Sequence, residues 1–129
     1  MNLTVNLAWR ELKGLNRNGW NIKKELLENY FKKIKATHKT LQIPIILKGR
    51  TYNPIEGVPA HDIIGFVNDV DLDSRQANIS IYKNEFSDIF KDRLLGFGLI
   101  AEKDENGQVI TCTFITCAYP IEEINSVWR

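Results

Sequence analysis

The serine and cysteine side chains, which are the candidate nucleophiles, all lie in the second half of the chain. They are Ser74, Ser80, Ser87, Ser126, Cys112 and Cys117. A serine or cysteine attacks a carbonyl group when a base lies within hydrogen-bonding distance, and the natural bases here are the two histidines, His38 and His61. Spacing along the chain does not show which nucleophile a histidine would meet. A hydrolytic site and a purely structural role for these residues both stay open.

The residues that could ligate a metal lack the spacing of a metal site. The histidines and cysteines form neither a Cys-x2-Cys nor a His-x3-His pair, which zinc sites commonly use. Asp69, Asp71 and Asp73 have the spacing that opens a calcium-binding loop. The sixth and twelfth positions of that loop, however, hold Ser74 and Ser80 instead of glycine and glutamate. We therefore expect no metal and no cofactor, and we expect the aspartates to lie on the exposed face of a hairpin.

The two cysteines are predicted to be reduced. If Cys112 and Cys117 share one strand, five residues at about 3.4 Å each place them roughly 17 Å apart and on opposite faces. A disulfide needs Cα atoms within about 7 Å of each other. Reduced thiols are typical of proteins inside the cell, so the cysteines favour a cytosolic protein.

One segment has clear helical periodicity. Apolar residues recur at helical spacing from about residue 22 to residue 36, with lysines on the opposite side. The apolar positions are Ile22, Leu26, Leu27, Tyr30, Phe31 and Ile34. Asn21 is placed to cap the N-terminus of this amphipathic helix. We expect the apolar stripe to enter the core and the lysines to face solvent, although a basic helix can also bind nucleic acid.

Outside this helix an apolar period of two predicts strands. They are expected at Leu3–Trp9, Leu41–Lys48, Ile63–Leu72, Ala77–Tyr82, Phe97–Lys103 and Val109–Ala118. Pro44 places the second of these strands at a sheet edge or a bulge. A short helix is expected at about 84–94, with Phe86, Ile89 and Phe90 facing inward. The fold class is therefore α+β, with a mostly antiparallel sheet or a small barrel.

Length, charge and composition limit the possible classes of protein. The chain has 129 residues, which favours a single domain over 1–129, and no apolar run approaches the roughly 18 residues of a membrane span. Residues 1–50 carry a net charge of +8 and residues 51–129 a net charge of −7. Such an asymmetry suits a basic surface that meets nucleic acid or an acidic partner, or head-to-tail self-association. Alternatively, the two halves fold together and their charges intermix on one surface.

Two motifs and the elements between them carry a resemblance to a known family. The segment His61–Val67 (HDIIGFV) leads into the first predicted hairpin, and the short helix follows. The segment Leu94–Gly98 (LLGFG) then opens a second hairpin, which ends in Tyr119–Pro120. Over residues 60–120, this order resembles the prohead (capsid maturation) proteases of tailed phages, which are relatives of the herpesvirus assemblins.

The resemblance has one departure that bears on activity. It places His61 at the position of the family's catalytic histidine and Gly98 at the glycine of the family's serine motif. The nucleophilic serine of that motif falls on Gly96, which has no side chain that could attack a carbonyl. The resemblance therefore implies a protease-like fold without the nucleophile.

The leading hypothesis is a non-enzymatic phage or prophage protein that acts by contact with a protein partner or by self-association. It would be a capsid-associated or assembly component on a degenerate protease-like fold, in the host cytoplasm or in the virion. One alternative is an active maturation protease that uses His61 with an unrecognised nucleophile such as Ser87 or Cys112. Another is a small inhibitor or nucleic-acid-binding protein that uses the basic helix. No membrane partner is expected.

Overall fold

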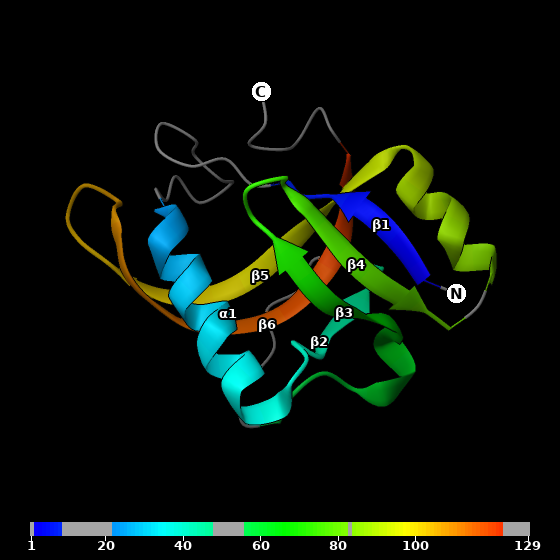
Figure 1. The fold of residues 1–129 in the computed structure, drawn as a ribbon, viewed down its shortest axis with the longest axis horizontal. Helices are drawn as coiled ribbons and strands as arrows, with labels where there is room; N and C mark the ends of the chain where they lie inside the picture. Colours follow the sequence, from blue (N-terminus) through cyan, green and yellow to red (C-terminus); the bar gives the residue numbers. More distant parts are fainter. Residues whose placement is uncertain (1, 9–21, 48–55, 83, 123–129) are drawn as a thin grey trace.

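A six-stranded, mostly antiparallel sheet and two helices make up the described part of the chain (Figure 1). The computed structural model describes residues 2–8, 22–47, 56–82 and 84–122. The elements are β1 (Asn2–Asn6), α1 (Lys24–His38), β2 (Ile43–Ile46), the 3₁₀ turn η1 (Ala60–Asp62), β3 (Ile63–Asp71), β4 (Gln76–Ile81), the 3₁₀ helix η2 (Asn84–Lys91), β5 (Arg93–Lys103) and β6 (Val109–Glu122). The predicted α+β class is confirmed.

The sheet closes on itself at one point. Its strand order is β1-β4-β3-β2-β6-β5, in which β3–β4 and β5–β6 are antiparallel hairpins. The two hairpins are joined through β2, which pairs with β6 in parallel at Ile45 and Ala118. At the outer strands, Leu7 forms a parallel bridge with Leu95, and the backbone N–H of Ala8 donates to the Leu95 carbonyl at 2.8 Å. This contact between the first and last strands of the order gives the sheet the character of a small barrel.

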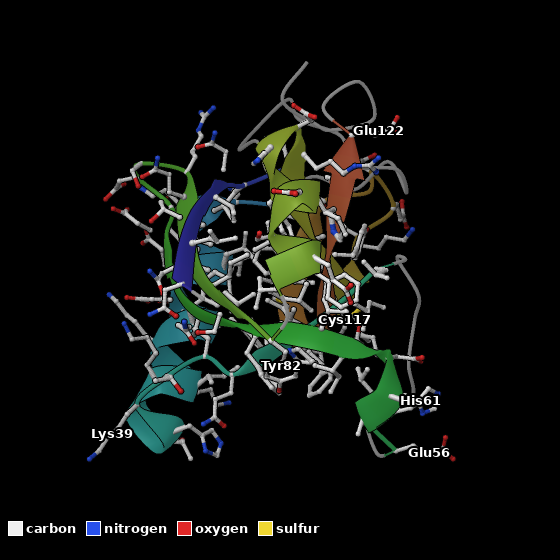
Figure 2. All side chains as sticks on the ribbon, turned by 90° about the vertical axis from the view of Figure 1, so that its right-hand side faces the viewer. Lys39, Glu56, His61, Tyr82, Cys117 and Glu122 are labelled. Atoms are coloured by element: carbon white, nitrogen blue, oxygen red, sulfur yellow. The ribbon has the colours of Figure 1, made fainter. Side chains whose placement is uncertain are left out.

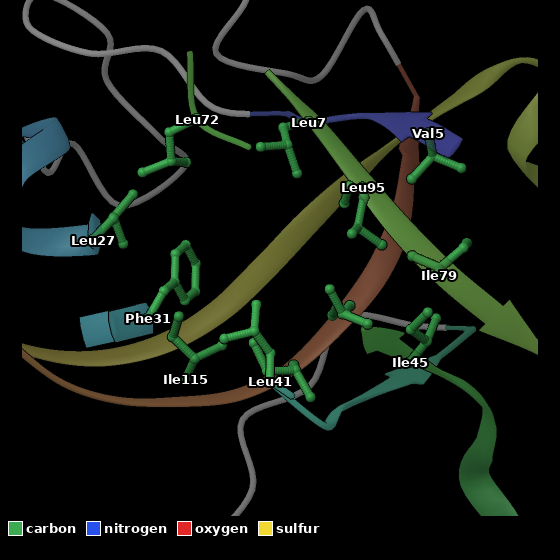
Figure 3. Packing of buried hydrophobic residues seen from close by; sticks show 14 of the residues in the cluster. Val5, Leu7, Leu27, Phe31, Leu41, Ile45, Leu72, Ile79, Leu95 and Ile115 are labelled. Atoms are coloured by element: carbon green, nitrogen blue, oxygen red, sulfur yellow. The ribbon is translucent and has the colours of Figure 1, made fainter. Parts of the chain in front are cut away.

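Helix α1 packs its apolar stripe onto the curved β5–β6 hairpin. Leu27 and Phe31 are only 2% and 5% exposed, and all six positions of the predicted stripe belong to the core or pack against it. Figure 3 shows Leu27 and Phe31 beside Leu72 and Ile115, above the long sweep of β5 and β6. The Phe31 ring also lies 6.0 Å, centroid to centroid, from that of Phe97 in β5. The prediction that this stripe is core is confirmed.

Strand β6 carries three register shifts against β5, and they change which of its residues face inward. The pairing skips Ile110, Thr113 and Thr116, so each is an extra residue on β6. A bulge of this kind reverses the alternation of side chains and increases the local twist. As a result, the residues of β6 that join the core recur every three positions, whereas in a regular strand they recur every two. They are Val109, Cys112, Ile115 and Ala118.

Several predicted boundaries differ from the structure. The helix begins at Lys24 with Lys23 in the N-cap position and no side-chain cap, so the prediction of Asn21 as the cap is wrong. Asn21 itself lies outside the described residues, as do the predicted strand ends Trp9 and Lys48. The second predicted helix ends at Lys91 instead of residue 94, because the pairing of β5 with β6 already begins at Arg93.

Two of the described prolines lie within strands, and each corrects part of the sequence-based prediction. Pro44 lies in β2, which is an interior strand between β3 and β6, so its predicted edge position is wrong. The alternative, a bulge, agrees with the register shift after Ile45. Pro120 extends β6 beyond its predicted end at Ala118 by pairing with Leu95.

None of the described helices is long and apolar enough to cross a membrane.

Candidate functional site: the groove beside α1

A groove of about 700 Å³ separates α1 from the first half of β6. We call it the α1–β6 groove. Its walls are Leu26, Asn29, Tyr30, Lys33, Ile34, Thr37 and His38 from α1, residues 41–44, Gly57 and Val58, and residues 111–116 of β6. Most of this lining is apolar, with hydroxyl and amide groups along it. A groove of this size and composition is typical of a binding site.

The floor of the groove is held by one hydrogen bond between helix and strand. The backbone N–H of Ile115 donates to the hydroxyl oxygen of Tyr30 at 3.1 Å. Burial raises the pKa of the Tyr30 hydroxyl, although the hydrogen bond from Ile115 acts in the opposite direction. The phenol therefore stays neutral at physiological pH and serves here as a hydrogen-bond acceptor for the backbone.

Cys112 lies in the wall of the groove, in an environment that disfavours the thiolate form of its side chain. Burial raises the pKa of this thiol from 9.0 to about 11. The thiolate, which is the nucleophilic form, is therefore scarce near neutral pH. The raised pKa therefore disfavours Cys112 as the nucleophile of the alternative hypothesis. Cys117 is fully buried and is not part of the main core cluster, and both cysteines carry thiols instead of a disulfide.

The charged groups that line the α1–β6 groove are all basic. Lys33 and His38 come from the exposed side of α1, and no aspartate or glutamate is among the described lining residues. Lys39, the C-cap residue of the same helix, is exposed as well. The groove therefore favours a ligand that combines apolar groups with negative charge.

The opposite flank of α1 is tied to the β3–β4 hairpin by ion pairs. Lys24 binds Asp73, and Lys35 lies 3.0 Å from Asp69. The hydrogen bond with Asp73 raises the pKa of Lys24. These pairs join the basic first half of the chain to the acidic second half. At this flank the two charge sets intermix, as one of the two sequence interpretations proposed.

The aspartates of the calcium-like spacing are used within the hairpin. Asp71 accepts the backbone N–H groups of Asp73 and Ser74 at 3.0 and 3.3 Å, which closes the turn between β3 and β4. The hydrogen bond from the Ser74 N–H holds the pKa of Asp71 below its usual value. Asp69 and Asp73 are exposed, as expected, and bind lysines of α1. Among the described residues no group of three or more His, Cys, Asp or Glu side chains is placed to hold a metal ion.

His61 lies away from the groove, at the surface of η1 (Figure 2). Its side chain is 83% exposed, and its Nε2 atom lies 3.4 Å from the carboxylate of the adjacent Asp62. Gly96 is buried in β5, where an added Cβ would lie 3.4 Å from the Tyr119 ring and 3.5 Å from Ile121. A side chain at the position of the family's serine would therefore meet these two residues.

The other candidate nucleophiles are distributed over separate parts of the molecule. Ser87 lies in η2 and lines a shallow hollow beside β1, with Leu3 and Val5. Ser80 accepts a hydrogen bond from Asn68 and donates one to Asn2 on the outer face of the sheet. Ser74 belongs to the hairpin turn. Ser126 lies outside the described residues. The hydrogen bonds of Ser74 and Ser80 described above involve neither His38 nor His61.

The glycine of the HDIIGFV motif has a packing role. A Cβ atom on Gly65 would overlap the backbone carbonyl oxygen of Ser80 in the neighbouring strand. Only glycine fits at this close approach of β3 and β4. This part of the motif is therefore explained by strand packing.

The sequence analysis missed the α1–β6 groove as a site. It assigned Tyr30 and Ile34 to the core stripe and His38 to the possible bases, but nothing in the spacing linked them to residues 111–116. The signal that was available is the repeated threonine at residues 111, 113 and 116, which is polar where a buried strand would be apolar.

Comparison of the chain with known protein families, curated proteins and solved structures finds no match in any of the three. The function is therefore inferred from the chemistry of the groove and of the residues around it.

Proposed function

We propose that the protein is a non-enzymatic binding protein that acts by contact with a protein partner, and that the partner is held in the α1–β6 groove. The observation that carries this proposal is the groove itself: apolar walls, with Lys33 and His38 as the basic residues of its described lining. An apolar lining with a few placed polar groups is the usual composition of a recognition site. The high pKa of Cys112, about 11, argues against a role for this wall in nucleophilic catalysis.

The resemblance of residues 60–120 to the prohead proteases of tailed phages supports the biological setting that we propose. With glycine in place of the nucleophilic serine, such a chain would retain the fold for binding. We propose a phage or prophage protein that is capsid-associated or takes part in capsid assembly, in the host cytoplasm or in the virion. Portal and major capsid genes beside the gene for this chain would support this setting, and a neighbourhood of unrelated genes would contradict it.

A photocrosslinking experiment tests the binding proposal. A photoreactive phenylalanine analogue replaces Thr113, which is exposed and lines the groove, in cells that contain the phage or prophage genes. The same analogue replaces Ile110 as a matched control, because Ile110 is 57% exposed on the same strand but lies outside the groove. We expect a discrete crosslinked protein from position 113 and none from position 110. Equal crosslinking from both positions, or none from 113, would contradict binding in the groove.

A hydrolysis assay tests the non-enzymatic part of the proposal. We expect the purified protein to be inert toward itself and toward unfolded casein, and His61→Ala to change no rate. Self-cleavage that is abolished by His61→Ala would overturn this part and restore the protease alternative.

A further inference from the structure

The side of β6 that faces the α1–β6 groove is an open strand edge. In the described residues β2 pairs with β6 only at Ala118, whereas β5 pairs with β6 along the whole hairpin. Residues 111–116 therefore have a strand neighbour on the β5 side and the groove on the other. An unpaired strand edge presents backbone N–H and C=O groups that can pair with an added strand.

Tyr30 occupies the position of a missing strand at one point of this edge. In a sheet, the N–H of Ile115 would donate to a carbonyl oxygen of the neighbouring strand. Here it donates to the hydroxyl oxygen of Tyr30 at 3.1 Å. The phenol oxygen thus stands where a backbone carbonyl oxygen of a bound strand would stand. An incoming strand has to replace this one hydrogen bond with an equivalent one.

The bulges at Thr113 and Thr116 restrict what can pair with this edge. Each bulge bends β6, and the Thr116 hydroxyl donates to the Gly98 carbonyl at 3.0 Å, which fixes the bend toward β5. Bulges in natural proteins blunt strand edges against long, regular addition. The edge therefore suits a short extended segment and disfavours the stacking of a second copy of the same strand.

The charge of the groove specifies the side chains of such a segment. Side chains of a strand alternate between two faces. The α1 wall of the groove combines apolar residues such as Leu26 and Ile34 with the cation Lys33, so a strand with both apolar and acidic side chains finds a partner for each kind. No acidic side chain among the described lining residues would repel a carboxylate.

We propose that the groove binds a short extended segment of the partner, in which apolar and acidic residues alternate, by strand addition to β6. A carbonyl oxygen of the segment accepts the Ile115 N–H and displaces the Tyr30 hydroxyl. This inference rests on the proposed function and specifies the partner's chemistry and the mode of binding.

The probe is a capped synthetic peptide of alternating valine and glutamate, of about seven residues, which is the length of an ordinary strand. Its binding is followed by the amide chemical shifts of the protein at millimolar peptide. One comparison peptide carries a methyl group on every backbone nitrogen and cannot pair as a strand. A second comparison peptide has lysine in place of glutamate. The protein variants are Tyr30→Phe, which removes the competing hydroxyl, and Lys33→Glu, which reverses the charge of the wall.

We expect the first peptide to shift the amides of residues 111–116 and the two comparison peptides to bind more weakly. Tyr30→Phe should tighten binding about threefold to tenfold, the equivalent of one hydrogen bond that no longer has to be exchanged. Lys33→Glu should weaken it. A purely structural role for Tyr30 predicts no tightening. Equal binding of the N-methylated peptide, or an unchanged affinity in Tyr30→Phe, would overturn strand addition and leave groove binding intact.

No shift at residues 111–116 with any peptide would also overturn strand addition. The proposed function is tested separately, because the crosslink from position 113 depends neither on the peptide nor on how its backbone pairs.

Discussion

The two flanks of α1 are closed in different ways. On the flank toward the β3–β4 hairpin, Lys24 and Lys35 of the helix bind Asp73 and Asp69 of the hairpin. On the flank toward β6, one hydrogen bond from Ile115 to Tyr30 spans the gap, and a groove of about 700 Å³ remains beside it. The flank toward the hairpin also has a hollow, of about 450 Å³, but charged side chains line it and the two ion pairs lie on this flank. We call it the closed flank, and we call the larger, mostly apolar flank toward β6 the open flank.

This difference shows where a fold of this size leaves room for a partner. On the closed flank Lys24 and Lys35 bind aspartates of the same chain, so these two lysines are poorly placed to attract another molecule. On the open flank the described lining residues include the cation Lys33 and no aspartate or glutamate, and the apolar lining is accessible. Unmatched charge beside accessible apolar surface is what distinguishes an interaction surface from an ordinary exposed face.

The largest expected effect comes from the residues that support both flanks. Phe31→Ala and Leu27→Ala each remove a buried side chain from beneath α1, and each should lower the free energy of unfolding by about 2–5 kcal/mol. Urea denaturation measures this, with Lys32→Ala at an exposed position of the same helix as the control. A loss below about 1 kcal/mol at both positions would mean that this face is not core.

The next effect is a pH dependence of the free energy of unfolding, which arises from Cys112 on the open flank. Folding raises the pKa of Cys112 to about 11, from 9.0, so the unfolded chain releases this proton first as the pH rises. The contribution of the protonated Cys112 thiol to the free energy of unfolding is complete below pH 9 and is lost between pH 9 and pH 11. Over that window the wild type should lose up to about 1.4 kcal/mol per pH unit relative to Cys112→Ala, measured by urea denaturation. Parallel pH profiles of the two proteins would contradict the burial of this thiol.

A smaller effect is expected from the hydrogen bond that spans the open flank. Tyr30→Phe keeps the ring and removes the acceptor of the Ile115 N–H, which should cost about 1 kcal/mol of stability. Thermal and urea unfolding of the variant measure it. No change in stability would indicate that water replaces the hydroxyl fully.

The smallest effect is expected on the closed flank. Asp69→Asn combined with Asp73→Asn removes both ion pairs, which are exposed and therefore screened by solvent. The loss of stability should be smaller than that of Tyr30→Phe and should disappear in about 1 M salt, where the screening length is only a few ångströms. A large, salt-independent loss would show that the ion pairs, and not the core, hold this flank.

The sequence alone predicted those helices and strands in which apolar residues recur at a regular helical or strand spacing. The stripe from Ile22 to Ile34 predicted both the helix and its buried face, because helical spacing and burial coincide there. The β3–β4 hairpin was predicted within one residue at each strand end, because apolar residues alternate along it and turn residues separate the strands.

The candidate site was not predictable in the same way. Bulges at three positions of β6 make its inward residues recur every third position, which no strand period anticipates. Within the described residues, the open edge depends on β2 pairing with β6 at Ala118 alone, a long-range feature without a local signal. His61 and Gly96, the residues that the family resemblance singled out, lie in η1 and in the buried part of β5, outside the groove.

Amide hydrogen exchange at Ile115 tests most directly whether the flank toward β6 is open. In the wild-type protein this amide donates to Tyr30 and should exchange slowly, whereas in Tyr30→Phe it should exchange much faster. The amides of β6 that pair with β5 serve as the internal control, because a general loss of stability would accelerate them as well. Selective acceleration at Ile115 is the result predicted for an edge that has no other partner. An Ile115 amide that remains protected in Tyr30→Phe would mean that something else covers this edge, and the flank would then be closed.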